Sequence, residues 1–327
     1  MRAVIMKNDR LWLCAIVMVA ASGCDQNPAS VTPRHSAEDQ ARLQEFVTQI
    51  KSEQVFVEGG EYLMGDFGEE YGVERLQYDG RKDSKPLHRV ELSSYSLSKF
   101  KASNQQYQFY LAWNGLKGRE VKGRISRQKW NEMERIPDAP AHVDWHEAER
   151  YCAWLGEVTG LPFSLPTEAQ WEYAARSRGK YVVAPTDDGT IRIEGQKGIN
   201  VATATDREMY ARQSENSLDI ASPLPRDFRP PNPLGIYDMA GNGWEWMKDW
   251  YDPEYYRHSP VKDPQGPGQP VFKDADGYYT RVLRSQDFSG PGRGLTMVRY
   301  KADPESRSYR PGDKTVRCAV NHPSPVK

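Results

Sequence analysis

The sequence predicts a single loop-rich domain of the α+β class. Pro and Gly together number 49 (23 plus 26), which is typical of long irregular connections. The 9 Trp and 18 Tyr provide the aromatic packing that such a fold requires. Helix-like and strand-like segments follow one another along the chain, and no linker-like segment interrupts them. We therefore expect one domain over residues 53–322 and a short tail at 323–327.

The overall charge and the motif content exclude several functional classes. The net charge is −1 and the mean hydropathy is −0.78, which are values typical of a polar, soluble protein. Neither half of the chain concentrates Lys and Arg, so we do not expect it to bind nucleic acid, whose phosphates require such clusters. The sequence contains no glycine-rich phosphate loop, HExxH, CxxC or nucleophile elbow.

Residues 1–23 have the pattern of a bacterial lipoprotein signal peptide. Three basic residues precede an apolar run over 11–20, which is too short to span a bilayer comfortably. The tetrapeptide Ala-Ser-Gly-Cys at 21–24 resembles a lipoprotein box, in which Cys24 would carry the lipid and begin the mature protein. The alternatives are a plain secretory signal with a chance cysteine and a retained anchor.

A lipid on Cys24 implies attachment to the periplasmic face of a bacterial membrane. Asp25 resembles the enterobacterial signal that keeps lipoproteins in the inner membrane, with the outer membrane as the alternative. Residues 24–52 are expected to form a tether and a short helix. The helix is predicted over 37–51, because four apolar residues share one face at helical spacing. These residues are Leu43, Phe46, Val47 and Ile50.

The first half of the domain is expected to alternate short strands with one helix. The helix begins with a capping Ser or Asn, and its Tyr and Leu residues recur at helical spacing. The predicted elements are strands at 55–57, 62–65 and 88–97, a charged loop at 66–84, the helix at 103–113 and an exposed basic segment at 115–138.

The strongest helix prediction covers residues 144–155. Asp144 is the expected N-cap, and Glu147 completes a capping box. Because Asp144 starts this helix, His142 lies outside it. His142 and His146 are therefore interpreted as a solvent-facing pair, although their spacing of four residues would suit metal ligands on one helix face.

The second main helix is expected over residues 165–176. Thr167 is its N-cap, and Gln170 completes the capping box. The chain is then expected to be mostly loop from 177 to 231, and a strand is predicted at 279–283.

Residues 232–246 (NPLGIYDMAGNGWEW) are the most distinctive stretch of the chain. Turn formers, two tryptophans and two acidic residues fit neither an amphipathic helix nor an alternating strand. We therefore expect a rigid, hydrogen-bonded loop. The segment resembles the central loop of the sulfatase-modifying-factor family, the formylglycine-generating enzymes and their relatives. Segments 56–65, 140–154 and 164–176 resemble further elements of that family in the same order.

The resemblance implies a formylglycine-generating-enzyme-like fold, which derives from the C-type-lectin-like fold. It has a twisted antiparallel sheet, two main helices and long irregular loops. The resemblance also implies a disulfide between Cys152 and Cys318, because exported members join the first helix to a C-terminal Arg-Cys strand. From the residues alone, export would make these two cysteines candidates for one disulfide, and the alternative is two separate buried thiols. Ser164 and Gln170 depart from the family, which usually has Arg and Glu there.

The family oxidises a cysteine of a substrate protein to formylglycine, with copper and two thiols near its C-terminus. This chain matches the preceding Arg-Val element at 281–284, but residues 285–287 differ from the family's Gly-Gly-Ser. Counting forward places Leu295 and Tyr300 where the thiols would lie. Neither side chain can replace a thiolate as a ligand of a soft metal. We therefore expect neither bound copper nor formylglycine generation.

The resemblance also implies structural calcium. One site would use Asn200 and Val201, and a second would use Asn242, Gly243 and Glu245, because hard oxygen ligands at tight loops suit calcium. The alternative for Glu245 is a bond to the backbone or to an arginine. The tryptophans of this region are expected in the core rather than at a ligand. They are Trp244, Trp246 and Trp250.

Two functions fit a retained scaffold without the thiols. The first is a binding or accessory role for a protein partner or peptide in the cell envelope, as in secretion-system accessory or immunity lipoproteins. The alternative is a tailoring oxidoreductase of the siderophore-maturation type, in which a phenol acts as an acid or radical site. Its polar pocket, which could equally be an exposed ion-pair face, would comprise Asp287, Arg293, Arg299, Tyr300 and Arg307.

Overall fold

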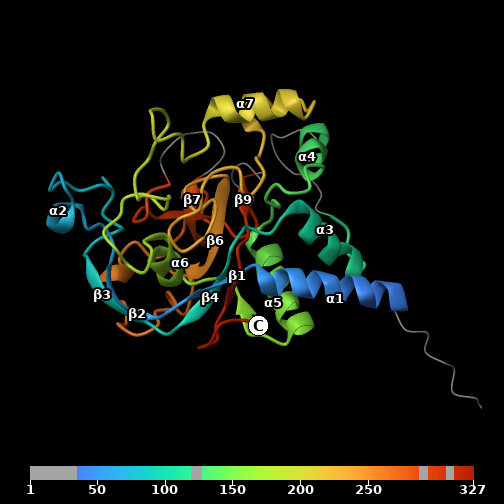
Figure 1. Ribbon diagram of the computed structural model, residues 1–327. Helices are drawn as coiled ribbons and strands as arrows, with labels where there is room; N and C mark the ends of the chain where they lie inside the picture. The colour runs from blue at the N-terminus through green and yellow to red at the C-terminus, as the bar shows by residue number, and fades with distance from the viewer. Residues whose placement is uncertain (1–34, 119–126, 287–293, 307–312) are drawn as a thin grey trace, which may run out of the picture. The chain divides into compact units, whose positions relative to one another are not determined.

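The computed structural model describes residues 35–118, 127–286, 294–306 and 313–327 (Figure 1). The chain divides into two compact units, Met1–Ala41 and Arg42–Lys327, and the second contains the fold described below. The expected lipidation residue Cys24 and its neighbour Asp25 lie outside the described residues. None of the helices within the described ranges is long and apolar enough to cross a membrane.

Three small sheets organise the described part of the larger unit. The first has the strand order β1-β4-β10-β5, with all neighbours antiparallel. Its strands are β1 (Gln54–Val57), β4 (Tyr95–Ser98), β5 (Phe163–Ser164) and β10 (Ala319–Val320). This sheet therefore joins segments from the beginning, the middle and the end of the domain.

The other two sheets complete the expected antiparallel architecture. The second pairs β2 (Gly60–Met64) with β3 (His88–Leu92). The third has the order β8-β7-β6-β9, in which only the β6–β9 pair is parallel. Its strands are β6 (Gly243–Trp250), β7 (Arg281–Gln286), β8 (Tyr300–Ala302) and β9 (Lys314–Thr315).

The single strand predicted over 88–97 is wrong, because this segment forms β3 and β4, which belong to different sheets. The chain changes sheets at Ser93 and Ser94, where side-chain hydrogen bonds hold the backbone. Ser93 donates its N–H and its hydroxyl to the Asp263 carboxylate, at 2.7 Å each. Ser94 Oγ accepts from the Gly59 N–H at 3.0 Å. These bonds allow one segment to supply two sheets.

The two main helices are confirmed. Helix α5 (Trp145–Thr159) starts at Asp144, which exchanges two hydrogen bonds with Glu147 in the predicted capping box. Helix α6 (Glu168–Ala175) has the same arrangement at its N-cap Thr167. α5 packs against β5 and β6, and α6 packs against β2, β3, β6 and β7. The two helices thus connect all three sheets.

The earlier helices are confirmed as well. Helix α1 (Ala37–Ser52) buries the predicted apolar face, and its Phe46 stacks on Phe109 of helix α3 (Asn104–Trp113) with 4.6 Å between ring centroids. Since the compact unit starts at Arg42, it takes in most of α1 and begins before the expected boundary at residue 53.

Several described helices lie where the sequence predicts loops. Helix α4 (Arg127–Glu134) falls in the segment expected to be exposed, but its Trp130 and Met133 are buried, and Met133 packs with Leu218. The burial is not apparent from the charged composition around them. The remaining helical elements are α2 (Gly68–Tyr71), α7 (Ala204–Gln213), η1 (Asp219–Ala221) and η2 (Tyr255–Arg257).

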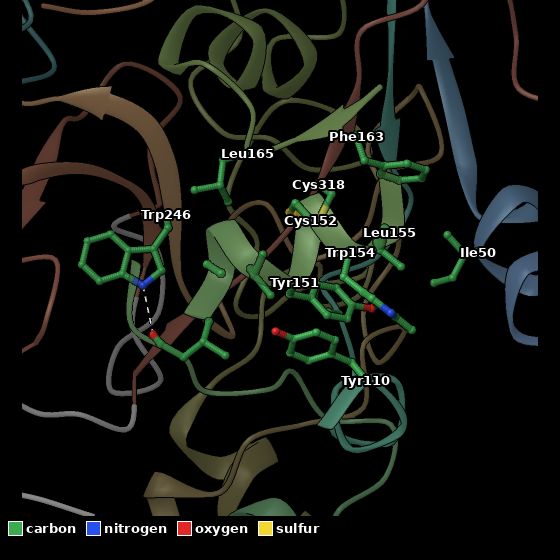
Figure 2. Packing of buried hydrophobic residues seen from close by; sticks show 14 of the residues in the cluster. Ile50, Tyr110, Tyr151, Cys152, Trp154, Leu155, Phe163, Leu165, Trp246 and Cys318 are labelled. Atoms are coloured by element: carbon green, nitrogen blue, oxygen red, sulfur yellow. Dashed lines mark hydrogen bonds between the residues drawn. A yellow bond between two sulfur atoms is a disulfide. The ribbon is translucent and has the colours of Figure 1, made fainter. Parts of the chain in front are cut away.

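A disulfide ties α5 to the segment that leads into β10. Cys152 and Cys318 are joined, with an S–S distance of 2.00 Å, and both residues are buried. Figure 2 shows the bridge among the side chains of the main core, with Trp154 and Phe163 nearby. The disulfide that the family resemblance implies is therefore confirmed.

Removing either cysteine should destabilise the protein by a similar amount. The bridge spans 166 residues, and the chain-entropy model gives about 4–5 kcal/mol for closing a loop of that length. Cys152→Ser and Cys318→Ser should therefore each lower the free energy of unfolding, and the double variant should be little worse than either one. Urea unfolding of the three variants measures this. Additive losses would contradict the bridge.

Candidate functional site

The segment 232–246 is held by side-chain hydrogen bonds, as predicted, although its last residues form the start of β6 rather than a loop. Asn232 Oδ1 accepts from the N–H groups of Leu234 and Ile236, and its amide donates to Ala174 O at 3.0 Å. This fixes the turn against the end of α6. From Gly243 onward the backbone pairs with β7 and β9, which accounts for the strand.

The predicted calcium residues Asn242 and Asn200 use their side chains within the protein. The Asn242 amide bonds to the N–H and the C=O of Leu224, at 3.1 and 2.9 Å, and donates to Asp238. Asn200 Oδ1 accepts from the Arg192 N–H at 2.7 Å, and its amide donates to several acceptors of the preceding loop.

These residues nevertheless lie close together. Asn200, Val201 and Asn242 line one small cavity of about 20 Å³, together with Asp238. That volume is on the scale of a single water molecule. The sequence predicts two separate calcium sites for these residues, whereas the structure brings them to one cavity. Both asparagine side chains there hold neighbouring loops by hydrogen bonds.

Glu245 is the centre of a buried ion pair. It is fully buried, and Arg317 reaches its two oxygens at 2.8 and 3.1 Å. Trp171 Nε1 donates to the same carboxylate at 3.0 Å. Burial alone would raise the pKa of Glu245, but Arg317 and Lys101 outweigh it and hold the pKa below its ordinary value. The alternative reading of Glu245, a partner for an arginine, is therefore the one that the structure bears out.

Lys101 supplies a second cation to this cluster. Its Nζ donates to Gly241 O at 2.6 Å and to Gly243 O, and it lies 3.7 Å from Glu245 Oε1. An ammonium group therefore stands among the oxygens that the resemblance assigns to calcium. As arranged here, Gly243 and Glu245 do not fit a calcium ion, because the ion and the ammonium would compete for the same position.

A second buried ion network connects α6 with β7 and the segment before β8. Glu168 accepts from Arg284 at 2.9 Å and from Arg299 at 2.8 and 2.9 Å. Glu172 accepts from Arg284 and Arg176, each at 3.0 Å. All five side chains are buried. Because each of the three cations faces one of the two carboxylates, the network holds helix and sheet together through paired buried charges.

Of the predicted polar pocket, only Arg299 and Tyr300 lie within the described residues. Arg299 is buried, and besides Glu168 it donates to the backbone oxygens of Asp83 and Asp252. It therefore serves the ion network and is neither a pocket residue nor part of an exposed ion-pair face. Asp287, Arg293 and Arg307 lie outside the described residues.

Tyr300 and Leu295 occupy the positions expected for the thiols, and both are packing residues. The Tyr300 ring stands edge-on to Trp244 with 4.0 Å between centroids, and Arg81 Cζ lies 4.5 Å from the Tyr300 centroid. Leu295 packs with Phe67 and its neighbours. Trp246 is buried, as predicted, whereas Trp244 and Trp250 are half-buried.

The histidine prediction is wrong for His142, which is buried, whereas His146 is exposed. Burial, together with the charges of Lys101 and Lys314, lowers the pKa of His142 to about 3, so its ring is neutral at physiological pH. Among the residues that the structure describes, no group of three or more His, Cys, Asp or Glu side chains is arranged to hold a metal ion.

Fold and site together define a formylglycine-generating-enzyme-like domain. The family model for sulfatase-modifying factor enzyme 1-like domains matches residues 40–321, and the chain belongs to that family.

Individual relatives agree with this assignment. The formylglycine-generating enzyme of Streptomyces coelicolor is 28% identical over 312 residues, which cover 81% of this chain and 88% of that enzyme. The serine/threonine-protein kinase pkn1 of Chlamydia caviae is 28% identical over 235 residues, or 68% of this chain. The match covers 32% of the kinase, so the chain spans about a third of that relative. PvdO from Pseudomonas aeruginosa shares the fold, with a TM-score of 0.58 and 24% identity over 82% of this chain and 93% of PvdO.

Asp249→Asn should remove part of the pH dependence of stability. Asp249 accepts the Glu168 N–H at 2.9 Å, and burial together with the Glu168 carboxylate raises the pKa of Asp249 to about 7. A raised carboxyl pKa favours folding while the group is protonated, and this stability is lost as pH rises through the folded value. The wild type should therefore lose about 1 kcal/mol, relative to the variant, between about pH 6 and about pH 8.

The measurement is urea unfolding of both proteins at the two pH values. The amide of the variant retains an acceptor for the Glu168 N–H, so the comparison isolates the charge. Equal pH slopes in the two proteins would show that Asp249 does not titrate in this range.

Proposed function

We propose that this protein is an envelope lipoprotein whose formylglycine-generating-enzyme-like domain binds a protein or peptide partner and does not generate formylglycine. The single observation that carries the proposal is the packing of Tyr300 between Trp244 and Arg81, at the position of a family thiol. A phenol in that place supplies a binding surface where the family requires a metal-binding sulfur.

The cysteine inventory supports the loss of the family reaction. The chain has four cysteines, of which Cys14 and Cys24 belong to the leader and its lipoprotein box. Cys152 and Cys318 are consumed by the disulfide. No thiol is left over in the mature sequence to bind copper or to exchange with a substrate cysteine.

The face around Tyr300 suits a peptide with acidic and aromatic side chains. Trp244 and Tyr300 are half-buried, and the Arg81 side chain is 44% exposed. Lys301 follows on the same strand and is exposed. Its Nζ lies 4.6 Å from the ring centroid of Tyr251, which places a second cation beside an aromatic ring on this strand. Aromatic rings beside cations are characteristic of protein recognition surfaces.

The location belongs to the same proposal. The lipoprotein box would place Cys24 at the membrane and the domain in the periplasm, where the disulfide can form. Asp25 favours the inner membrane over the outer one if the enterobacterial sorting rule applies. If the bound partner is also periplasmic, the protein would act as an accessory or immunity lipoprotein of a secretion system.

The oxidoreductase alternative receives less support. It requires an open polar pocket, but Arg299 is buried and engaged with Glu168. PvdO resembles the chain at 24% identity, which is a likeness of fold.

Purified residues 25–327 should form no aldehyde on a cysteine peptide of the sulfatase type in the presence of copper. The reason is that Leu295 and Tyr300 cannot bind the metal or form the thiolate adducts that the reaction needs. Mass spectrometry of the peptide is the measurement, with the Streptomyces coelicolor enzyme as the positive control. Aldehyde product above the copper-only background would sink the proposed loss of catalysis.

The full-length protein should be recovered with the membrane fraction and capture its partner there by chemical cross-linking. Arg81→Ala should reduce the captured partner by about tenfold, the effect of losing a charge-assisted contact. Cys24→Ser should shift the protein to the soluble fraction. Quantitative mass spectrometry of the cross-linked material provides both readouts.

The matched control is Arg89→Ala, because Arg89 is also exposed (57%) and pairs with Glu61 on the β2–β3 sheet. It should leave capture unchanged. Equal capture by Arg81→Ala and wild type would exclude the face around Tyr300, and a membrane-bound Cys24→Ser protein would exclude the lipid anchor.

A further inference from the structure

Lys101 is a fully buried lysine in the short connection between β4 and α3. Its backbone is fixed on both sides. Arg226 donates to Lys101 O at 3.1 Å, and the next residue, Ala102, donates its N–H to Val316 O at 2.8 Å. The side chain therefore projects from a rigid support, and the position of its ammonium group is defined by the fold.

The ammonium group stands at the turn that leads into β6. Gly241 O and Gly243 O both accept from Nζ, and Glu245 Oε1 lies 3.7 Å away. The turn itself is demanding, because Asn242 has a φ of 58° and Gly243 a φ of 106°. Two carbonyl oxygens that point at one place repel each other, so a positive charge between them stabilises this backbone conformation.

The charge balance of the cluster depends on the same group. Glu245 is shared between Arg317 and Lys101, and Asp238 provides further negative charge nearby. Burial lowers the pKa of Lys101 to about 8 while Glu245 opposes the change, so the side chain remains mostly protonated at pH 7. Two carbonyls and a carboxylate are also the kinds of oxygen that a hard metal ion binds, with solvent completing the rest of its coordination shell.

We infer that the Lys101 ammonium takes the place of a metal ion in this protein, so that the turn 241–243 is held by a covalently attached cation and does not depend on calcium. The geometry carries the inference, because the two carbonyl oxygens and the carboxylate converge on Nζ. The inference is independent of the proposed function and concerns how the central loop is stabilised.

The test compares the thermal unfolding of wild type and Lys101→Ala with excess EDTA or with millimolar calcium. The wild type should unfold at the same temperature in both. Lys101→Ala should unfold at a temperature lower by roughly 10 °C in EDTA, the scale expected for breaking a buried ion cluster in a domain of this size. Calcium should restore part of that loss, because the vacated position is surrounded by oxygens.

Two controls make the result specific. Lys101→Met fills the space without a charge, so it should be destabilised but should not respond to calcium. Lys99→Ala removes another cation from the same connection. The Lys99 ammonium lies over the rings of Phe100 and Tyr237 and not among oxygens, so calcium should not change the unfolding temperature of this variant. If Lys101→Ala does not fold in EDTA, its recovery on refolding with calcium is the equivalent readout.

Either of two outcomes overturns the inference. The first is a wild-type protein that calcium stabilises or EDTA destabilises, because a metal ion would then act alongside Lys101. The second is a Lys101→Ala variant whose unfolding temperature, or recovery on refolding, is no more sensitive to calcium than that of Lys101→Met.

Discussion

The structure depends on the buried Arg317–Glu245 ion pair more than on any other interaction. Arg317 uses all five of its N–H donors: it makes two bonds to Glu245 and three to the backbone oxygens of Ser98, Lys99 and Tyr237. It thus connects the exit of β4, the central turn and β6. The next residue is Cys318, whose disulfide fixes the segment to α5. Removing one partner of such a pair leaves an uncompensated charge in the core, which costs about 3–5 kcal/mol.

The position of this pair separates the residues that hold the family fold from the half-buried face around Tyr300. Glu245 faces inward from β6, between the two main helices and the sheets, whereas Tyr300 lies half-buried on β8. The residues that hold the fold are therefore different from those that would react with a substrate. Leu295 and Tyr300 are partly buried and pack against the edges of the core clusters, and neither takes part in the ion pair.

The sequence predicts elements well where the signal is local. The capping boxes at Asp144 and Thr167 mark both main helices, because a cap is formed by residues three positions apart. The change of sheet at Ser93 is not predictable in this way, since it depends on Asp263, which is distant in the sequence. Helix α4 is missed because its few apolar residues are dispersed among charges, and only tertiary packing reveals that they are buried.

In the candidate site, too, features with a sequence motif could be predicted, and features that depend on distant partners could not. The identity of the central loop and the disulfide could be inferred from motif resemblance. Arg299 and Lys101 could not be placed, because a charged residue reads as exposed unless its partner is known, and the partners Glu168 and Glu245 come from other elements. For Lys101 no local signal exists, since a lone lysine before a helix cap is unremarkable in sequence.

The sheet order has a consequence for how the protein reaches its folded state. β4 is flanked by β1 from the start of the domain and by β10, while β6 is flanked by β9, so residues 313–320 complete two sheets at once. Contacts of such high sequence separation form late and slowly, because the chain entropy must be lost before they contribute. A polypeptide that lacks this segment leaves the edges of β4 and β6 open and Glu245 without Arg317. The domain is therefore expected to remain incompletely folded, and open to proteolysis, until its last strands have been synthesised.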